Sequence, residues 1–310
     1  MKPLIVVTGS LNMDFVLSMD ALPAPGQTVL GSSFQMLPGG KGANQACACG
    51  KLANGSVLVR MTGRVGYDIF ADHLKASLSA AGVDVSAVHA TKAQPTGVAT
   101  IWVDRDGQNS IVVAPGANAV LTPADIGGMR ATFRNADYAL FQLETPLDTV
   151  STGLQIARQE EASTILDPAP ARPLDPGLLS MVDILTPNET EACVLLGVPP
   201  RPIDLDQAPA IARDLRSRTS VRTVVLKLGE KGCLWWDGEE EVHSPAFPVH
   251  AIDTTAAGDT FNGALAVALA EDRPVGEALR FANAAAALST TRIGAQASIP
   301  PRADVDALLR

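Results

Sequence analysis

The sequence of 310 residues has few cysteines, few histidines and few aromatic residues, and each shortage excludes a class of protein. Its 4 cysteines include one close pair, C-A-C at 47–49, with no matching pair elsewhere, and its 4 histidines are scattered, so a zinc site is not expected. We expect the cysteines to be small buried side chains in a reducing compartment. Aromatic residues make up 4% of the chain, which favours close-packed α/β layers over an aromatic-rich β-sandwich.

Clusters of basic residues and long apolar stretches are also missing. The chain has 24 Lys and Arg against 33 Asp and Glu, a net charge of −9, and no basic run, so the usual footprint of nucleic-acid binding is absent. The apolar run at 4–7 is too short for a signal sequence, and no stretch reaches the roughly 18 apolar residues that span a membrane. We expect a cytoplasmic protein without nucleic-acid or membrane partners. Any anionic ligand must then be bound locally, by backbone amides and a few cations.

Short β-branched runs alternate with helical patterns along the chain. The runs lie at 4–10, 56–63, 138–144, 163–170, 183–188 and 223–229, and helical patterns at 42–53, 68–82, 147–161 and 205–218. This alternation indicates βαβ units, that is, an α/β fold with a mostly parallel sheet flanked by helices. Ligands of such sheets gather at the carboxyl ends of the strands. No linker divides the chain, so we expect one domain over 1–310.

Two segments break this rhythm. Residues 12–36 alternate apolar and polar around a Pro/Gly turn, and residues 96–113 have the pattern of a hairpin that turns at Asp106 and Gly107. We expect both to form a small sheet that projects from the main one. The pattern alone leaves two interpretations open: a flap over the site, or an ordinary extension of the sheet edge.

The stretch DTTAAGDTF at 253–261 precedes an apolar, helix-forming run. Ala256, Ala257 and Gly258 are small enough for the backbone to approach a ligand, and a helix that begins there directs free amides and its positive dipole end at an anion. Asp259 beside such an anion site can act as a general base towards a hydroxyl. The alternative is a core helix with Asp259 as an ordinary first-turn acid.

The stretch PGGKGANQA at 38–46 is a glycine-rich turn that leads into a helix. It lacks the spacing of a Walker A loop, but its glycines permit close backbone approach and Lys41 offers a point charge for a phosphate. Asn44 has both a donor and an acceptor for a hydroxyl-rich ligand. Asn12 and Asp14 are two apart, so on an extended segment they face one side and suit sugar hydroxyls. A plain turn and a solvated loop are the alternatives.

Three further polar groups follow strands. Glu144 ends an apolar strand, which places it at the ligand-binding edge of the sheet. Asn188 and Glu191 are three apart at a helix start, where their oxygen atoms suit Mg²⁺ through water, or where Asn188 simply caps the helix. The glycine-bracketed loop at 227–232 could cradle a phosphate or only turn the chain.

In order along the chain, these motifs resemble the ribokinase-like (PfkB) carbohydrate kinase family. GGKGANQA, DPAPA at 167–171, TPNETEA at 186–192 and DTTAAGDTFNGAL look specifically like its ribokinase branch, and the resemblance runs from GSLNMD to GAQASIP. It implies ATP-dependent phosphorylation of a primary hydroxyl of a sugar, ribose 5-phosphate being the product if ribose is the substrate. It also implies a ribokinase-like fold with a lid, formed by about 12–36 and 96–113, that covers the sugar and contributes to a homodimer.

The resemblance further implies roles for single residues. Asp259 matches the catalytic base and Ala256, Ala257 and Gly258 match the anion hole. Sugar-holding positions match Asn12, Asp14, Gly40, Lys41, Gly42, Asn44, Glu144 and Asp259. Nucleotide positions match Asn188, Lys227, Leu228, Gly229, Glu230, Lys231, Gly232, Gly258 and Asn283. Glu191 matches an acid linked to Mg²⁺ through water, and positions that hold a monovalent cation, usually K⁺, match Asp253, Thr255, Ser289, Arg292, Gly294 and Ser298.

Departures from the family pattern are few. Lys227 stands where many members carry a hydroxyl residue, and Ala297 where proline is frequent. Alternatives to a ribose kinase are a kinase for deoxyribose or a nucleoside, and a non-catalytic sugar or nucleotide sensor, against which the retention of Asp259 and Lys41 argues. A dinucleotide-dependent dehydrogenase is excluded because no G-x-G-x-x-G follows the first strand.

Overall fold

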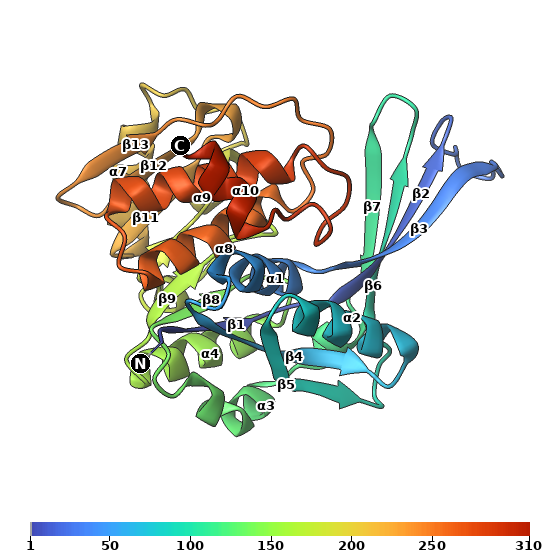
Figure 1. Ribbon diagram of the computed structural model, residues 1–310, viewed down its shortest axis with the longest axis horizontal. Coiled ribbons are helices and arrows are strands. Elements are labelled where there is room, and N and C mark those ends of the chain that lie inside the picture. The colour runs from blue at the N-terminus through green and yellow to red at the C-terminus, as the bar shows by residue number, and fades with distance from the viewer. Residues whose placement is uncertain (1) are drawn as a thin grey trace.

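The computed structural model describes residues 2–310 and contains one large and one small β-sheet (Figure 1). Neighbouring strands of the large sheet are parallel except at one end, where the pairs β11–β12 and β12–β13 are antiparallel. In spatial order its nine strands are β13 (Glu241–Ser244), β12 (Cys233–Trp236), β11 (Thr223–Lys227), β10 (Ile184–Leu185), β9 (Ser163–Leu166), β8 (Tyr138–Phe141), β1 (Leu4–Thr8), β4 (Leu58–Gly66) and β5 (Val83–Thr91).

Helices cover both faces of the large sheet. One face carries α1 (Lys41–Ala53), α2 (Ile69–Ala80), α8 (Ala257–Ala270), α9 (Val275–Ser289) and α10 (Arg302–Leu308). The other carries α3 (Pro123–Gly128), α4 (Leu147–Gln159), α5 (Pro176–Leu179), α6 (Glu189–Leu195) and α7 (Ala208–Thr219). Short 3₁₀ segments lie at Gly116–Val120, Arg130–Phe133 and Gly229–Lys231.

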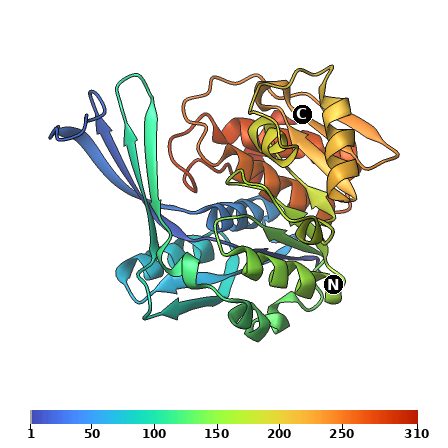
Figure 2. The same cartoon turned by 180° about the vertical axis from the view of Figure 1, so that it is seen from behind.

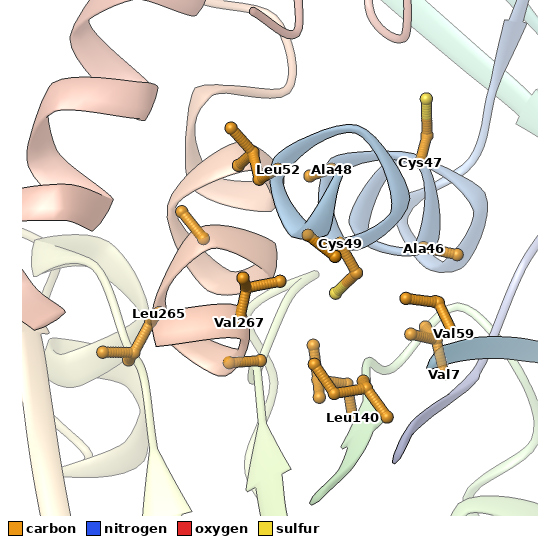
Figure 3. Close-up of a cluster of buried hydrophobic side chains, with 14 of the residues drawn as sticks. Val7, Ala46, Cys47, Ala48, Cys49, Leu52, Val59, Leu140, Leu265 and Val267 are labelled. Atoms are coloured by element: carbon orange, nitrogen blue, oxygen red, sulfur yellow. The ribbon is translucent and has the colours of Figure 1, made fainter. Parts of the chain in front are cut away.

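Strand β1 shows why the sheet has two hydrophobic cores. Successive side chains of a strand point to opposite faces. Ile5 and Val7 therefore enter the core beneath α1 and α8, whereas Leu4 and Val6 enter the core beneath α4. In the first core, shown in part in Figure 3, α1 and α8 pack closely because their facing residues are small. A side chain at Gly263 of α8 would meet Ala48 of α1, so this approach requires glycine.

The small sheet projects from the main body, as Figures 1 and 2 show from opposite sides. Its order is β3 (Gly31–Gly39), β2 (Asn12–Met19), β6 (Gly97–Val103) and β7 (Asn109–Ala114). The hairpin predicted at Asp106 and Gly107 is confirmed, because β6 and β7 pair antiparallel across that turn. Asp14 lies opposite Leu37 and Ala99, and Ala99 lies opposite Val113, so these side chains share one face of the sheet.

The predicted fold class is confirmed: an α/β fold with a mostly parallel sheet flanked by helices and a small additional sheet. The six predicted runs all contain strands, although β10 has only two residues. Strands β5, β12 and β13 and helices α3, α5, α9 and α10 were not predicted. All four cysteines are buried and unpaired, as expected for small core side chains. Among residues 2–310, no helix combines the length and apolarity needed to cross a bilayer.

Candidate active site

The site is built around Asp259, near the start of α8. The chain enters this helix through Ala256, which adopts the left-handed backbone conformation with φ of 58°. The turn places Asp259 inside the molecule, where its side chain is 6% exposed and accepts two hydrogen bonds. Asn44 Nδ2 donates to Oδ2 over 3.0 Å, and Gln45 Nε2 donates to Oδ1 over 3.1 Å. Both donors lie on α1, which packs against α8. The two helices therefore fix the orientation of the carboxylate.

The surroundings of Asp259 favour a proton acceptor that works near neutral pH. Burial raises the pKa of Asp259 to about 6 from its ordinary value of 3.8. The Lys41 ammonium opposes this shift, the Asp167 carboxylate adds to it, and the amides of Asn44 and Gln45 lower the pKa again. At pH 7 the group is thus ionised in most molecules while its pKa remains close to the working pH, which is the condition for an efficient general base.

The residues predicted to hold a sugar lie together on one side of Asp259. The backbone N–H of Lys41 and the hydroxyl of Ser10 donate to Glu144 Oε2, over 3.1 Å and 2.6 Å. Asn12 is buried and its side-chain oxygen accepts from Asn118 Nδ2 over 2.8 Å. Sequence reasoning missed Ser10 and Asn118, which hold these groups in place. Segments from three strand ends and from α1 therefore meet at one polar site.

The charged side chains of this site shift one another's pKa values. Burial, Glu144 and Asp259 raise the pKa of Asp14 to about 7, and Lys41 opposes them. Burial lowers the pKa of Lys41, but the carboxylates around it, with Asp259 and Glu144 the largest contributors, raise it above its ordinary value. Lys41 therefore stays protonated and neutralises part of the negative charge. Such a cluster of shifted carboxyl groups is typical of a functional site.

The glycines before α1 are required for its start to reach the other groups. Gly40 has φ of 87°, and a Cβ atom there would lie 2.7 Å from the Asn12 nitrogen and 2.9 Å from the Ser10 carbonyl oxygen. A Cβ at Gly42 would lie 2.6 Å from the Gly9 carbonyl carbon. The sequence GGKG thus lets β3, the turn after β1 and α1 converge on Lys41.

A cavity of about 910 Å³ is lined in part by Ala257, Gly258 and Phe261 of α8. Predicted nucleotide residues that line it are Lys227, Gly229, Glu230, Lys231, Gly232, Gly258 and Asn283. Asn283 also donates to the Ser244 carbonyl over 2.9 Å, which ties α9 to the end of β13. Leu228 and Asn188 do not line the cavity: Leu228 is buried in the core, and Asn188 lies at the start of α6. Phe247, Pro248 and Val249, which sequence reasoning missed, add an apolar wall.

Asn188 and Glu191 form a reciprocal helix cap, the alternative that the sequence had left open. Glu191 N–H donates to Asn188 Oδ1 over 2.8 Å, while Asn188 N–H and Nδ2 donate to the two Glu191 oxygens over 2.7 Å and 3.0 Å. Burial raises the pKa of Glu191, Lys227 lowers it and Asp167 raises it. Within residues 2–310, no cluster of three or more His, Cys, Asp or Glu side chains could hold a metal ion.

The six residues predicted to hold a monovalent cation lie on the loop before α8, at the end of α9 and on the loop after it, and these segments contact each other. Asp253 accepts from the N–H groups of Thr255 and Gly294, both over 2.9 Å. Ile252 N–H donates to the Thr290 carbonyl over 2.7 Å. Ser289, the last residue of α9, donates its hydroxyl to the Ala286 carbonyl of that helix, and Ser298 donates to the Ala295 carbonyl in the following loop. Arg292 pairs with Asp304 over 2.7 Å. The structure thus brings the segments together, directly beside the turn into α8.

Comparison with known proteins identifies relatives over the whole chain. The family model of the pfkB family carbohydrate kinase matches residues 2–302. A ribokinase of Haemophilus influenzae is 40% identical over 302 residues, which cover 97% of each chain. A deoxyribokinase of Salmonella typhi is 37% identical over 298 residues, 96% of this chain and 95% of that one. The structure of an Arabidopsis thaliana ribokinase complexed with ribose and ATP superimposes with a TM-score of 0.91 at 35% identity and covers 100% of this chain and 99% of that one.

Fold, site and relatives together define the class of protein as a carbohydrate kinase. The chain belongs to the pfkB carbohydrate kinase family, and the resemblance that its motifs suggested is confirmed.

Proposed function

We propose that the protein is an ATP-dependent sugar kinase that phosphorylates the 5-hydroxyl of D-ribose and releases D-ribose 5-phosphate and ADP. The observation that carries the proposal is the position of Asp259, a buried carboxylate that accepts from Asn44 and Gln45 and directly follows Gly258, which lines a cavity of about 910 Å³. Ribokinases from several organisms are similar over nearly the whole chain, which supports ribose as the sugar.

In the proposed mechanism, Asp259 removes the proton from the 5-hydroxyl while that oxygen attacks the terminal phosphorus of ATP. The proton ends on the carboxylate, the new bond joins the sugar oxygen to phosphorus, and the bond from phosphorus to the oxygen of the departing ADP breaks. Asn44 and Gln45 keep both carboxylate oxygens in position. The base thus needs no rearrangement when the sugar arrives.

The start of α8 provides the charge stabilisation. The first N–H groups of a helix have no acceptor within the helix. Here Ala257 N–H already bonds to the Thr254 carbonyl over 3.2 Å, and Thr260 N–H is bonded to the Ala256 carbonyl over 2.8 Å. Of the two N–H groups between these, those of Gly258 and Asp259, only Gly258 belongs to a residue that lines the cavity. Its N–H is therefore the proposed donor to negative charge on the transferred group, and Lys41 adds positive charge from the sugar side.

The small sheet is proposed to act as the lid. Its face that carries Asp14 also carries Leu37, which lies beside Gly294 of the main body, so this face is turned towards the site. Ile111 and Val113 on the same face are 54% and 46% exposed. Apolar side chains there would exclude water above the sugar and limit hydrolysis of ATP. The same exposed strands are the proposed contact of a homodimer.

Two cations complete the proposal. Mg²⁺ is commonly held by one or two carboxylates together with nucleotide phosphates. Glu191 fits this role through water, since its oxygens already accept bonds from Asn188 but each retains a lone pair. A bound Mg²⁺ would neutralise phosphate charge. The oxygen-rich loops around Asp253 suit K⁺, which would stiffen the turn into α8. The buried, unpaired thiols accord with a reducing compartment such as the cytoplasm.

The test is turnover of a panel of sugars, with ADP release as the readout, in the presence and absence of K⁺. The panel contains ribose, deoxyribose and nucleosides. The proposal predicts the highest kcat/KM with ribose and a loss of rate without K⁺. The second candidate, a deoxyribose kinase, is favoured by the similar chain named deoxyribokinase. Faster turnover of deoxyribose than of ribose would establish that candidate, and no turnover of any sugar would leave the sensor interpretation.

A further inference from the structure

Asp167, immediately after β9, joins the two halves of the site. Lys227 Nζ donates to its Oδ1 over 2.9 Å, and Gln45 Nε2 donates to its Oδ2 over 3.0 Å. The same Gln45 nitrogen donates to Asp259 Oδ1 over 3.1 Å. A continuous chain of contacts therefore runs from the lysine at the end of β11, through Asp167 and Gln45, to Asp259.

The orientation of Gln45 is fixed by a further contact. Gln142 Nε2 donates to Gln45 Oε1 over 2.6 Å. The Gln45 amide therefore directs its NH₂ group at Asp167 and Asp259 and its oxygen at Gln142. Of the five residues in this chain of contacts, all except Lys227 are buried. In such surroundings, a change at one member displaces the others rather than being absorbed by solvent.

The ion pair is poorly explained by stability alone. The side chains of Lys227 and Asp167 are only 13% and 4% exposed. Removing two charges from water costs several kcal/mol per ion, and a buried pair often gives no net stabilisation compared with apolar residues. This pair also lies between the large cavity and the start of α8. Lys227 lines the large cavity, and its Nζ lies 3.6 Å from where a Cβ at Gly258 would stand. Its ammonium is thus beside the start of α8.

We infer that Asp167 is a positioning residue for phosphoryl transfer: it holds the Lys227 ammonium between the nucleotide cavity and the start of α8, and through Gln45 it fixes the orientation of Asp259. This inference rests on the proposed kinase function. It assigns to Lys227 the binding of a phosphate oxygen, and it explains the lysine that stands where many family members have a hydroxyl residue. A lysine there requires a buried counterion, which Asp167 supplies.

The inference has an electrostatic consequence that a merely structural role lacks. Charged groups that influence Asp259 come from four elements: Lys41 at the start of α1, Asp14 on β2, Asp167 after β9 and Lys227 on β11. Asp167 raises the pKa of Asp259, and the positive charge of Lys227 acts in the opposite sense. Neutralising either member of the pair must therefore move the pKa of Asp259, in opposite directions.

The experiment compares Asp167→Asn, Lys227→Met, the double variant and a control. Asp183→Asn is the matched control. Asp183 directly precedes β10, the strand beside β9, and so lies at the amino ends of the strands, whereas Asp167 lies at their carboxyl ends. Its carboxylate is also partly buried and paired with an arginine. Measurements are the pH profile of kcat, the KM for ribose, calorimetric binding of a non-hydrolysable ATP analogue, and titration of the Asp259 carboxyl carbon by NMR. The double variant removes both charges together and so protects against failure to fold.

For Asp167→Asn we expect a fall in kcat of roughly 10- to 100-fold, the usual effect of misplaced reacting groups, with little change in the KM for ribose. The acidic limb of the pH profile, where kcat falls as Asp259 becomes protonated, should shift to lower pH. Lys227→Met should shift that limb to higher pH and weaken binding of the analogue. The double variant should return the limb towards its original pH while kcat stays low. Asp183→Asn should leave kcat and the limb unchanged.

The inference is overturned if Asp167→Asn folds with unchanged kcat and an unmoved limb, or if its only effect is a lower unfolding temperature. It is also overturned if the double variant recovers normal kcat. Failure of the proposed function gives a different result, because the unaltered protein itself would then turn over no sugar. The NMR titration would still test the coupling of Asp167 to Asp259 in that case, and an unchanged Asp259 pKa in Asp167→Asn would refute it.

Discussion

The change Asp259→Asn tests the assigned base with the least disturbance of shape. Asparagine keeps the volume of aspartate but cannot accept a proton at neutral pH. In the structure the two Asp259 oxygens accept from Asn44 and Gln45. With Asn44 and Gln45 in their present orientations, the new NH₂ group faces one of these donors and that hydrogen bond is lost. The variant removes the base and also one of its two restraints.

The structure predicts that Asp259→Asn lowers activity but raises stability at pH 7. Loss of the base should lower kcat by at least ~10²-fold, the usual contribution of general-base catalysis, with a smaller effect on sugar binding. The pKa of Asp259 lies at about 6 instead of 3.8, which corresponds to a penalty of roughly 3 kcal/mol for holding the ionised group in the fold. Since the folded pKa is raised, this penalty develops as pH rises from about 4 to 6 and is complete at pH 7.

Asparagine carries no charge and avoids this penalty, while the lost hydrogen bond costs about 1 kcal/mol. The variant should therefore be more stable at pH 7 by about 2 kcal/mol, and equally stable or less stable at pH 3. The assays are ADP release with ribose and urea unfolding at both pH values. A slow but stabilised variant supports the assignment. Turnover near that of the unaltered protein would refute the base, and lower stability at pH 7 would refute the electrostatic reasoning.

Three further outcomes follow from the same geometry. The pH profile of kcat should fall below pH about 6, because the raised pKa of Asp259 leaves the base protonated there; a flat profile down to pH 5 would contradict this. Gly40→Ala should destabilise the fold by about 2 kcal/mol or more and impair activity, because a Cβ atom there meets backbone atoms. The control is Gly55→Ala, where φ is also positive, at 83°, but the space around the new Cβ is open. It should lower stability by only about 1 kcal/mol. Ile111→Lys with Val113→Lys should raise the ratio of ATP hydrolysis to sugar phosphorylation and, in sedimentation, shift a dimer towards monomer; unchanged values would refute the lid and its contact.

Much of the fold could be predicted because its causes are local. The β-branched runs and the amphipathic helices between them carry the period of their structure, and the turn at Asp106 and Gly107 indicates a hairpin by its residue types. Strand β5, VDVSAVHAT, was missed because it lacks the continuous apolar run by which strands such as β1 and β11 were recognised. Helix α9 was also not predicted.

The site could be predicted only in part. Asp259, Lys41 and Asn44 were expected on the strength of their motifs, and the structure brings them together. The link through Gln45 and Asp167 was not predicted. Gln45 is 122 positions from Asp167 and 214 positions from Asp259 in the sequence, so these side chains meet only after the sheet and its helices assemble. The burial of Lys227 has the same origin, since its sequence shows only a cation before a glycine-rich turn. The roles of Asn188 and Glu191 as a helix cap were visible in sequence and are realised.

The central claim is most directly tested by a crystal structure with ribose and a non-hydrolysable ATP analogue. In that complex the 5-hydroxyl should lie within hydrogen-bond reach of Asp259, about 2.6–3.2 Å, and the terminal phosphorus should lie beside the Gly258 N–H at the start of α8. A terminal phosphorus far from that helix start, or a hydroxyl turned away from Asp259, would contradict it.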